Sequence, residues 1–249
     1  MSKVARITVL IAAMTMVCMV AGRAEAMNAF KARYEATYGI FPLGEYRLTF
    51  DRLPAGRYRY ESDSDPSGLV RLFSDKRVVE RSEGRWTPDG PRPERYERRV
   101  HSDDGWQTDV IVLGNRPRVI TPDGEYRIDP PPDALDPAGL LLQIIHDFRR
   151  GHLDGEYTLV DEHGKSRHYR TRDMGTASVE VMGRKWQARH MRRAGGDPSR
   201  GLDVYLVRDL GGLPARIDYV AKGRRFKMYL EDLQGIPIPV KHAPGKPRD

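Results

Sequence analysis

The chain has 249 residues, with 42 lysine and arginine residues against 35 aspartate and glutamate residues, a formal net charge of +7 at pH 7. Cys18 is its only cysteine, which excludes an internal disulfide framework and a site built from several thiolates, such as structural zinc. The length suits one domain or two with a substantial core.

Residues 1–26 have the pattern of a cleaved export signal. Lys3 and Arg6 give a positive start, residues 7–20 form an apolar run, and Ala24-Glu25-Ala26 supplies the small residues that signal peptidase requires. Removal of residues 1–26 would leave 223 residues with 39 basic and 34 acidic side chains, a net charge of +5. The pattern predicts a periplasmic protein, with no transmembrane segment after cleavage; an uncleaved membrane anchor is the alternative.

Alternating polar and apolar residues begin directly after this segment. Residues 30–38 place Phe30, Tyr34 and Tyr38 on one face and charged residues on the other, which is typical of a half-buried strand. A second such segment contains Tyr46, Leu48 and Phe50, and we predict that residues 39–44 form the turn between the two. Similar segments, separated by turn residues, are 57–62, 69–73, 77–81, 96–101, 107–113, 116–120 and 125–128.

One helix interrupts the strands. Asp136 is suited to the N-cap, Pro137 to the first turn, and Gly151 to the left-handed end. Arg149 and Arg150 complement the negative end of the helix dipole. We expect the helix to lie on the sheet and to bury one apolar stripe, made of Leu140, Leu141, Ile144, Ile145 and Phe148.

Strands resume after the helix, and residues 162–164 and 221–223 resemble hairpin turns. The pattern predicts a mainly β fold: a large curved antiparallel sheet, barrel-like or a sandwich, with one packed α-helix. We expect one β-rich domain over residues 27–235 and a flexible, proline-rich tail over residues 236–249. An integral outer-membrane barrel is disfavoured because several strands carry charge on both faces. The later strand segments are 157–161, 166–172, 177–182, 185–192, 203–207, 215–220 and 225–230.

The sequence offers no catalytic constellation. The histidines lack the close spacing of zinc ligands, and no Gly-x-Ser-x-Gly nucleophile turn occurs, so no metal, cofactor or catalytic residue is expected. If the protein were instead a hydrolase of cell-wall or lipid substrates, Glu61, Asp63 and His101 would be its candidates. Acidic residues are interspersed among the basic ones, which favours solvated strand faces; nucleic acid is not an expected partner.

Four short motifs in chain order resemble one bacterial family. They are Tyr34-x-x-x-Tyr38-Gly39-x-x-x-x-Gly44-x-Tyr46, Arg92-Pro93-x-Arg95-Tyr96, Asp136-Pro137-Ala138-Gly139-Leu140 and Leu213-Pro214-Ala215-Arg216-Ile217. Together they resemble the exported proteins grouped as the domain of unknown function 3108 family. The resemblance implies a periplasmic, strand-rich domain without an established activity, and it supplies no catalytic residues.

These features lead to one functional hypothesis and an alternative. The hypothesis is a periplasmic, non-catalytic binding or carrier protein for a hydrophobic or amphiphilic cell-envelope molecule, such as a lipid or a lipoprotein-like ligand. The alternative is a structural or interaction module that joins an envelope protein through a sheet edge or the tail. For the carrier, the candidate ligand contacts on the concave face are Tyr34, Tyr46, Leu48, Phe50, Leu141 and Ile145.

Overall fold

A computed structural model describes residues 27–66, 76–161, 163–195, 201–221 and 223–239. The predicted export signal, the predicted strand at 69–73 and residues 240–249 of the predicted tail lie outside the described residues. Within them the chain forms fourteen β-strands, one α-helix and two short 3-10 turns. The α-helix α2 is Pro137–Arg149 and the 3-10 turns are η1 (Pro54–Gly56) and η3 (Arg208–Leu210). The strands are β1 (Phe30–Tyr38), β2 (Phe41–Leu53), β3 (Arg57–Pro66), β4 (Arg77–Thr87), β5 (Gly90–Ser102), β6 (Gly105–Val112), β7 (Arg118–Thr121), β8 (Gly124–Arg127), β9 (Gly155–Val160), β10 (Ser166–Val181), β11 (Arg184–Ala194), β12 (Gly201–Leu206), β13 (Pro214–Ala221) and β14 (Arg224–Gln234).

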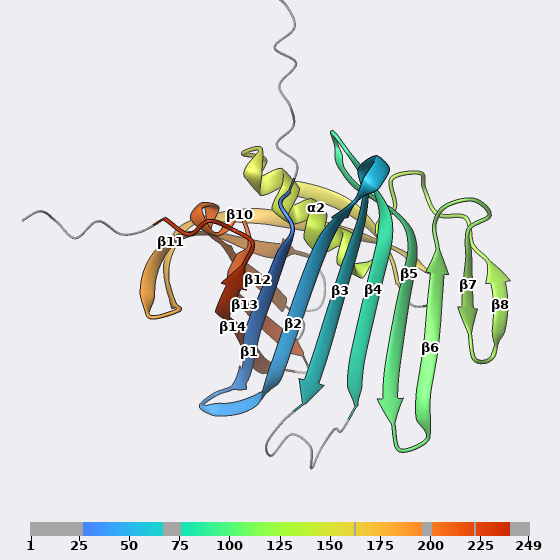
Figure 1. The fold of residues 1–249 in the computed structure, drawn as a ribbon, viewed down its shortest axis with the longest axis horizontal. Helices are drawn as coiled ribbons and strands as arrows, with labels where there is room; N and C mark the ends of the chain where they lie inside the picture. Colours follow the sequence, from blue (N-terminus) through green and yellow to red (C-terminus); the bar gives the residue numbers. More distant parts are fainter. Residues whose placement is uncertain (1–26, 67–75, 162, 196–200, 222, 240–249) are drawn as a thin grey trace, which may run out of the picture.

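All fourteen strands belong to one antiparallel sheet. Its order is β8-β7-β6-β5-β4-β3-β2-β1-β14-β13-β12-β11-β10-β9, so each half of the chain is a meander and the first and last strands pair at the centre. The sheet curves strongly but does not close, and its edges are β8 and β9 (Figure 1). The predicted large curved antiparallel sheet with one helix is confirmed.

The period-2 pattern places alternate side chains on the two faces. Tyr34, Leu48, Phe50 and Tyr60 on neighbouring strands are buried in one hydrophobic core, because residues of the same parity face the concave side. The convex face carries cross-strand pairs such as Arg59 with Glu83, whose Nε and Oε1 atoms lie 2.7 Å apart. The interspersed charges in the sequence therefore correspond to ion pairs on the outer face.

Several strands extend beyond the predicted segments, and two predicted breaks between strands are wrong. The first turn is only Gly39 and Ile40, since β2 already begins at Phe41. The two segments predicted at 166–172 and 177–182 form the single strand β10, with a register shift against β11 between Asp173 and Thr176. A bulge breaks the alternation of polar and apolar residues but leaves strand pairing intact on either side. The sequence therefore looks like two strands where the structure has one.

The helix begins as predicted but is more enclosed than predicted. Asp136 is the N-cap and accepts a hydrogen bond from the Gly139 amide at 2.6 Å, and Gly151 after the helix has φ +84°. However, Leu142 is fully buried, whereas Leu141 of the predicted stripe is only partly buried. The helix lies inside the curve of the sheet (Figure 1) and contacts β4, β5 and β9, so it buries more than one stripe.

The gap between the two sheet edges is bridged near the start of α2. The Leu135 amide donates to the Thr158 carbonyl and the Val160 amide donates to the Leu135 carbonyl, both at 2.8 Å. Leu135 thus forms an isolated parallel bridge with the otherwise unpaired edge of β9. A small second core joins Val160 to residues of β5, β6 and β7, namely Tyr96, Ile111 and Val119, together with Ala134 before the helix. Side chains and one short bridge thus hold together edges that no continuous ladder joins.

Candidate binding site

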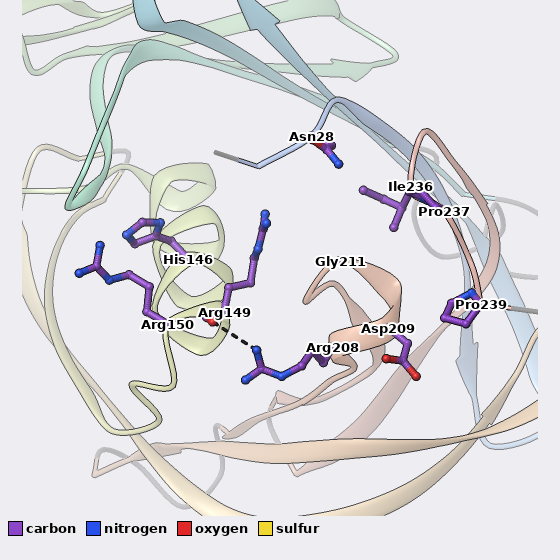
Figure 2. Close-up of a pocket in the computed structure, with 10 residues that line it drawn as sticks. All are labelled: Asn28, His146, Arg149, Arg150, Arg208, Asp209, Gly211, Ile236, Pro237 and Pro239. Atoms are coloured by element: carbon purple, nitrogen blue, oxygen red, sulfur yellow. Dashed lines mark hydrogen bonds between the residues drawn. The ribbon is translucent and has the colours of Figure 1, made fainter. Parts of the chain in front are cut away.

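A cavity of about 510 Å³ lies at the end of the molecule where α2 terminates. Four chain segments form its walls: Asn28 before β1, the last turn of α2, the η3 turn between β12 and β13, and the segment from Ile236 to Pro239 after β14 (Figure 2). The volume falls within the roughly 300–1,000 Å³ that small-molecule sites occupy. It is therefore large enough for a ligand of ordinary size.

Cationic side chains dominate the polar lining. Arg149 and Arg150 come from the end of α2 and Arg208 from η3, against the single carboxylate of Asp209. Figure 2 shows Arg149 extending from the helix toward Asn28, while Arg150 lies on the other flank of α2 in this view. The described lining carries three guanidinium groups and one carboxylate, so it favours an anion.

Backbone and ring contacts hold two of these arginines in place. Nη1 of Arg208 donates to the Arg149 carbonyl at 3.3 Å, and its guanidinium lies 5.5 Å from the Phe148 ring centroid. Nη1 of Arg150 donates to the Pro88 carbonyl at 2.9 Å. Each of these bonds uses one nitrogen of a guanidinium that carries five N–H donors, so donors remain for a bound anion.

The η3 loop reaches the helix because glycine follows it. Gly211 and Gly212 have φ of +70° and +83°, a region that favours glycine. A Cβ at Gly212 would lie 2.9 Å from Cγ of Arg149, and one at Gly211 would lie 3.1 Å from Cδ1 of Ile236. This pair of glycines lets the loop approach both the arginine wall and the apolar wall of the cavity.

His146 also lines the site, in surroundings that disfavour a positive charge on its ring. Its ring lies edge-on to Trp86 with centroids 5.8 Å apart, and burial lowers the pKa of the imidazole. Its Nε2 is buried and has no hydrogen-bond partner among the described residues. The favoured neutral form leaves the arginines as the source of charge.

The six residues predicted to contact a ligand lie in the core. Tyr34, Leu48, Phe50 and Ile145 are buried in the main hydrophobic cluster, and Tyr46 and Leu141 are partly buried against it. The Tyr34 hydroxyl donates to the Pro214 carbonyl at 2.9 Å, and the Phe50 ring stacks on Phe30 with centroids 5.7 Å apart. The fold brings these side chains into one cluster; contact with a ligand stays a prediction.

A polar cluster within the concave face was not predicted. Glu80 accepts hydrogen bonds from the Tyr96 hydroxyl at 2.5 Å and the Ser62 hydroxyl at 2.9 Å. Ser82 donates to Asp136 at 2.7 Å, and burial raises the pKa of Asp136 to about 7. The signal available in the sequence is that Ser62 and Ser82 occupy inward positions of their strands, where apolar residues usually stand.

The hydrolase candidates lie on the outer face. Arg77 donates from Nε to Oδ1 of Asp63 at 2.8 Å, and this hydrogen bond lowers the pKa of Asp63. Glu61 pairs with Arg81 at 3.7 Å, and the exposed His101 ring lies 5.0 Å from the ring of Trp106. The two carboxylates are thus engaged in ion pairs, and neither they nor His101 line the arginine cavity.

Sequence reasoning also missed most of the cavity. In the sequence, Arg149 and Arg150 stand out only as complements to the helix dipole, and no local pattern marks Asn28, Arg208 or Ile236. These residues lie far apart in the sequence and meet only because the β12–β13 loop folds onto the end of α2. Gly211-Gly212 after a short turn was the one local signal for that approach.

No cluster of three or more histidine, aspartate or glutamate side chains with the geometry of a metal site occurs in the part of the chain that the structure describes. Among the same residues, no helix has the length and apolar character needed to cross a membrane.

Comparison with solved structures supports the fold. The chain is similar to a beta-barrel-like protein of domain of unknown function DUF1849 from Brucella abortus, with a TM-score of 0.54, 15% identity, and coverage of 83% of this chain and 97% of that chain. MucB gives a TM-score of 0.35 at 14% identity, over 88% of this chain and 57% of that chain. A putative outer membrane lipoprotein-sorting protein domain from Vibrio parahaemolyticus gives 0.28 at 9% identity, over 84% and 86%. Of these three structures, the Brucella protein supports the fold, because the other two TM-scores are below 0.5.

Family comparison agrees with the four motifs found in the sequence. None of the curated proteins matches the chain significantly. The family model described as "Protein of unknown function (DUF3108)" matches residues 33–231, which span β1 to β14. The chain therefore belongs to the DUF3108 family.

Proposed function

We propose that this protein is a non-catalytic, periplasmic binding protein for an amphiphilic anion of the cell envelope, such as a lipid or lipoprotein-like ligand. The observation that carries the proposal is the cavity in which Arg149 and Arg208 lie beside an apolar wall. Such a site matches a molecule with one anionic group and one apolar part. The export pattern of residues 1–26 motivates the compartment, and the exported chain would consist of the β-rich domain, residues 27–235, and the residues that follow it.

The two walls of the cavity supply the two kinds of recognition. A guanidinium group donates two parallel hydrogen bonds to a carboxylate or phosphate. Ile236, Pro237 and Pro239 provide apolar surface on the opposite side. A ligand that satisfies only one wall would leave the other in contact with water, so both parts are needed for tight binding.

The predicted core contacts extend this proposal inward. Ile145 lies four residues before Arg149 in α2, so both side chains fall on one face of the helix. An acyl chain whose head group binds Arg149 would run toward Ile145 and displace core side chains around it. The remaining candidates, Tyr34, Tyr46, Leu48, Phe50 and Leu141, would be reached only by a longer chain.

The test is calorimetric titration with three probes below their micelle concentrations. Dodecyl phosphate should bind, whereas dodecyl maltoside, which is uncharged, and inorganic phosphate, which lacks the chain, should bind at least about tenfold more weakly, since tenfold corresponds to about 1.4 kcal/mol. The double variant R149Q/R208Q keeps the side-chain stems and should lose at least about tenfold in affinity for dodecyl phosphate.

The control variant is R52Q/R172Q, which removes the same charge from two exposed strand positions outside the cavity. It should bind like the wild type. Equal affinity of R149Q/R208Q and the wild type, or no binding of dodecyl phosphate by the wild type, would refute the proposal. Equal binding of inorganic phosphate would mean a site for a free anion.

The proposed compartment has its own test. After expression of the full chain in a Gram-negative host, the protein should be released with the periplasmic fraction, and N-terminal sequencing should begin at Met27. A chain that retains residues 1–26 in the membrane fraction would support the anchor and contradict cleavage.

A further inference from the structure

Exposed apolar side chains gather at the end of the sheet opposite the cavity. This end carries the β1–β2, β5–β6, β7–β8 and β13–β14 hairpins, and the β1–β2 hairpin lies at the lower edge of Figure 1 while α2 lies toward the upper edge. Among the described residues, eight large apolar side chains are exposed, and six of them lie within three residues of these turns: Tyr38, Ile40, Phe41, Trp106, Tyr126 and Tyr219. The others are Met174 and Ile238.

Four aromatic residues form a continuous row across adjacent strands. Phe41 of β2 is opposite Tyr38 of β1, Tyr38 is opposite Phe226 of β14, and Phe226 is opposite Tyr219 of β13. The ring centroids of Tyr38 and Phe226 are 5.5 Å apart, and those of Phe226 and Tyr219 are 6.5 Å apart. We call these four residues the aromatic row. It extends as far as the hairpin tip, where Ile40 is 90% exposed.

Charge is distributed unevenly between the two hairpins that bear this row. Residues 36–44, around the β1–β2 turn, contain no charged residue, whereas residues 219–227, around the β13–β14 turn, contain four basic residues and no acidic one. Arg224 and Arg225 are exposed, and Arg225 lies 3.5 Å from the buried carboxylate of Asp218. An apolar tip therefore stands beside a cationic one.

The neighbouring hairpins differ in a way that limits the surface. The β5–β6 turn carries Asp103 and Asp104, and the β7–β8 turn carries Asp123. These carboxylates oppose an anionic partner, so Trp106 and Tyr126 fall outside the surface we consider. The surface is confined to the aromatic row, Ile40 and the two arginines.

We propose that this surface docks the protein on a lipid bilayer that contains anionic lipids. Tyrosine and phenylalanine favour the boundary between head groups and acyl chains, and an apolar tip adds burial there. Basic residues beside the tip are attracted to the negative surface potential. A protein partner would need a complementary acidic and apolar patch, whereas an anionic membrane supplies both properties without one. This surface is separate from the arginine cavity, so the inference does not depend on the proposed ligand.

The test is a vesicle flotation assay with protein purified after expression of the full chain. One set of vesicles contains phosphatidylcholine alone, and the other contains phosphatidylcholine with about 30% phosphatidylglycerol. The protein should bind the anionic vesicles at least about tenfold better than the neutral ones, as expected for two or more basic residues near the surface. The variant I40S/F41S and the variant R224E/R225E should each lose at least about tenfold in binding. The first variant changes only side chains at an exposed tip, whereas the second also removes the ion pair of Arg225 with the buried Asp218. The two variants act at different places, so a folding defect in one leaves the other informative.

Two matched controls separate this surface from general effects. M174S removes an exposed apolar side chain elsewhere on the sheet, and R52E/R172E makes the same charge change at two other exposed positions. Both should bind the anionic vesicles within about twofold of the wild type, as should R149Q/R208Q, since surface substitutions away from a contact have small effects. Failure of the wild type to float with either vesicle, or equal losses in the controls, would overturn the inference.

Discussion

A single carboxyl group, that of Asp136, connects the helix to the sheet. One oxygen accepts from the Gly139 amide at 2.6 Å and so caps α2, and the other accepts from the Ser82 hydroxyl of β4 at 2.7 Å. Tyr58 extends this chain, with its hydroxyl 3.2 Å from Ser82. Burial raises the pKa of Asp136 from 3.8 to about 7.

This raised pKa predicts a pH dependence with a definite sign. Because the folded protein holds the Asp136 proton between about pH 4 and pH 7 while the unfolded chain has released it, stability from this group falls as pH rises through that window. Asp136→Asn, which keeps the capping oxygen, should remove this dependence.

The measurement is urea denaturation of both proteins at pH 5 and pH 8. Between pH 5 and pH 8, the free energy of unfolding of the wild type should fall by on the order of 2–4 kcal/mol more than that of D136N, at about 1.4 kcal/mol per unit of pKa shift. Other carboxylates, such as Asp63, whose pKa is lowered by an arginine partner, are present in both proteins. Their contribution therefore cancels when the two free energies are subtracted. If the difference in free energy of unfolding between the wild type and D136N were the same at both pH values, the pKa of Asp136 would not be raised in the folded protein.

The cap itself was predictable but its partner was not. Asp136 before Pro137 is a local signal, since an N-cap bonds to an amide two or three residues later in the chain. Ser82 lies 54 residues away, and a serine at an inward strand position says nothing about what it faces. Local chemistry could therefore be predicted at this residue, while the burial that raises its pKa and the bond to Ser82 both depend on the tertiary fold.

At the scale of the helix, Leu141 and Leu142 give opposite results in sequence and structure. The stripe pattern assigns Leu141 to the buried face, yet Leu142 is the fully buried residue of the two. The periodic pattern assumes one covered face, and β9 covers a second.

This difference predicts unequal costs of truncation. Leu142→Ala should lower the free energy of unfolding by about 3 kcal/mol or more, within the 2–5 kcal/mol usual for buried leucine, and Leu141→Ala by about 1 kcal/mol. Chemical denaturation of the two variants compares identical atom losses one residue apart. The reverse order would mean that the helix lies on the sheet with one buried stripe.

A close approach between β4 and β5 gives a second test at this scale. A Cβ at Gly84 would lie 2.1 Å from the Arg92 carbonyl oxygen, at the register shift that follows Glu83. Gly84→Ala should destabilise the protein by about 2 kcal/mol or more, because backbone must move to relieve the clash.

The matched control is Gly201→Ala in β12, where the nearest atoms are 3.7 Å away. There the extra methyl should be neutral or stabilise by up to about 1 kcal/mol, since glycine weakens a strand. Thermal or urea denaturation of both variants checks the pair. Similar effects at both positions would show that the Gly84 approach is not as tight as described.

For the whole molecule, the uneven closure of the sheet predicts an uneven pattern of amide exchange. Although β9 is an edge strand, its Val160 amide is bonded to the Leu135 carbonyl at 2.8 Å and the residue is fully buried. Strand β8 is exposed at every residue. Hydrogen exchange should therefore protect Val160 strongly and leave the amides of β8 that point outward to exchange rapidly. Comparable rates at both edges would argue against the bridge.

The sheet was predictable from the sequence to a greater degree than the site. Alternation marks each strand by itself, so Phe30–Tyr38 was located without knowledge of its neighbours. The cavity depends on Asn28, Arg208 and Ile236, which belong to three distant segments and follow no local period. The order of the strands could not be predicted either, because no local pattern in the sequence indicates that β1 pairs with β14.

That central pairing has a consequence for how the chain assembles. Seven strands follow β1 before the helix, and each pairs with the one before it, so this half can form from local hairpins as the chain emerges. The other edge of β1 waits for residues 224–234, about two hundred positions later. Such a distant contact is slow to form, and an unpaired edge is open to wrong partners in the meantime. The centre of the sheet is thus the last part to form. A chain that ended before β14 would have two half-sheets but not the strand that joins them.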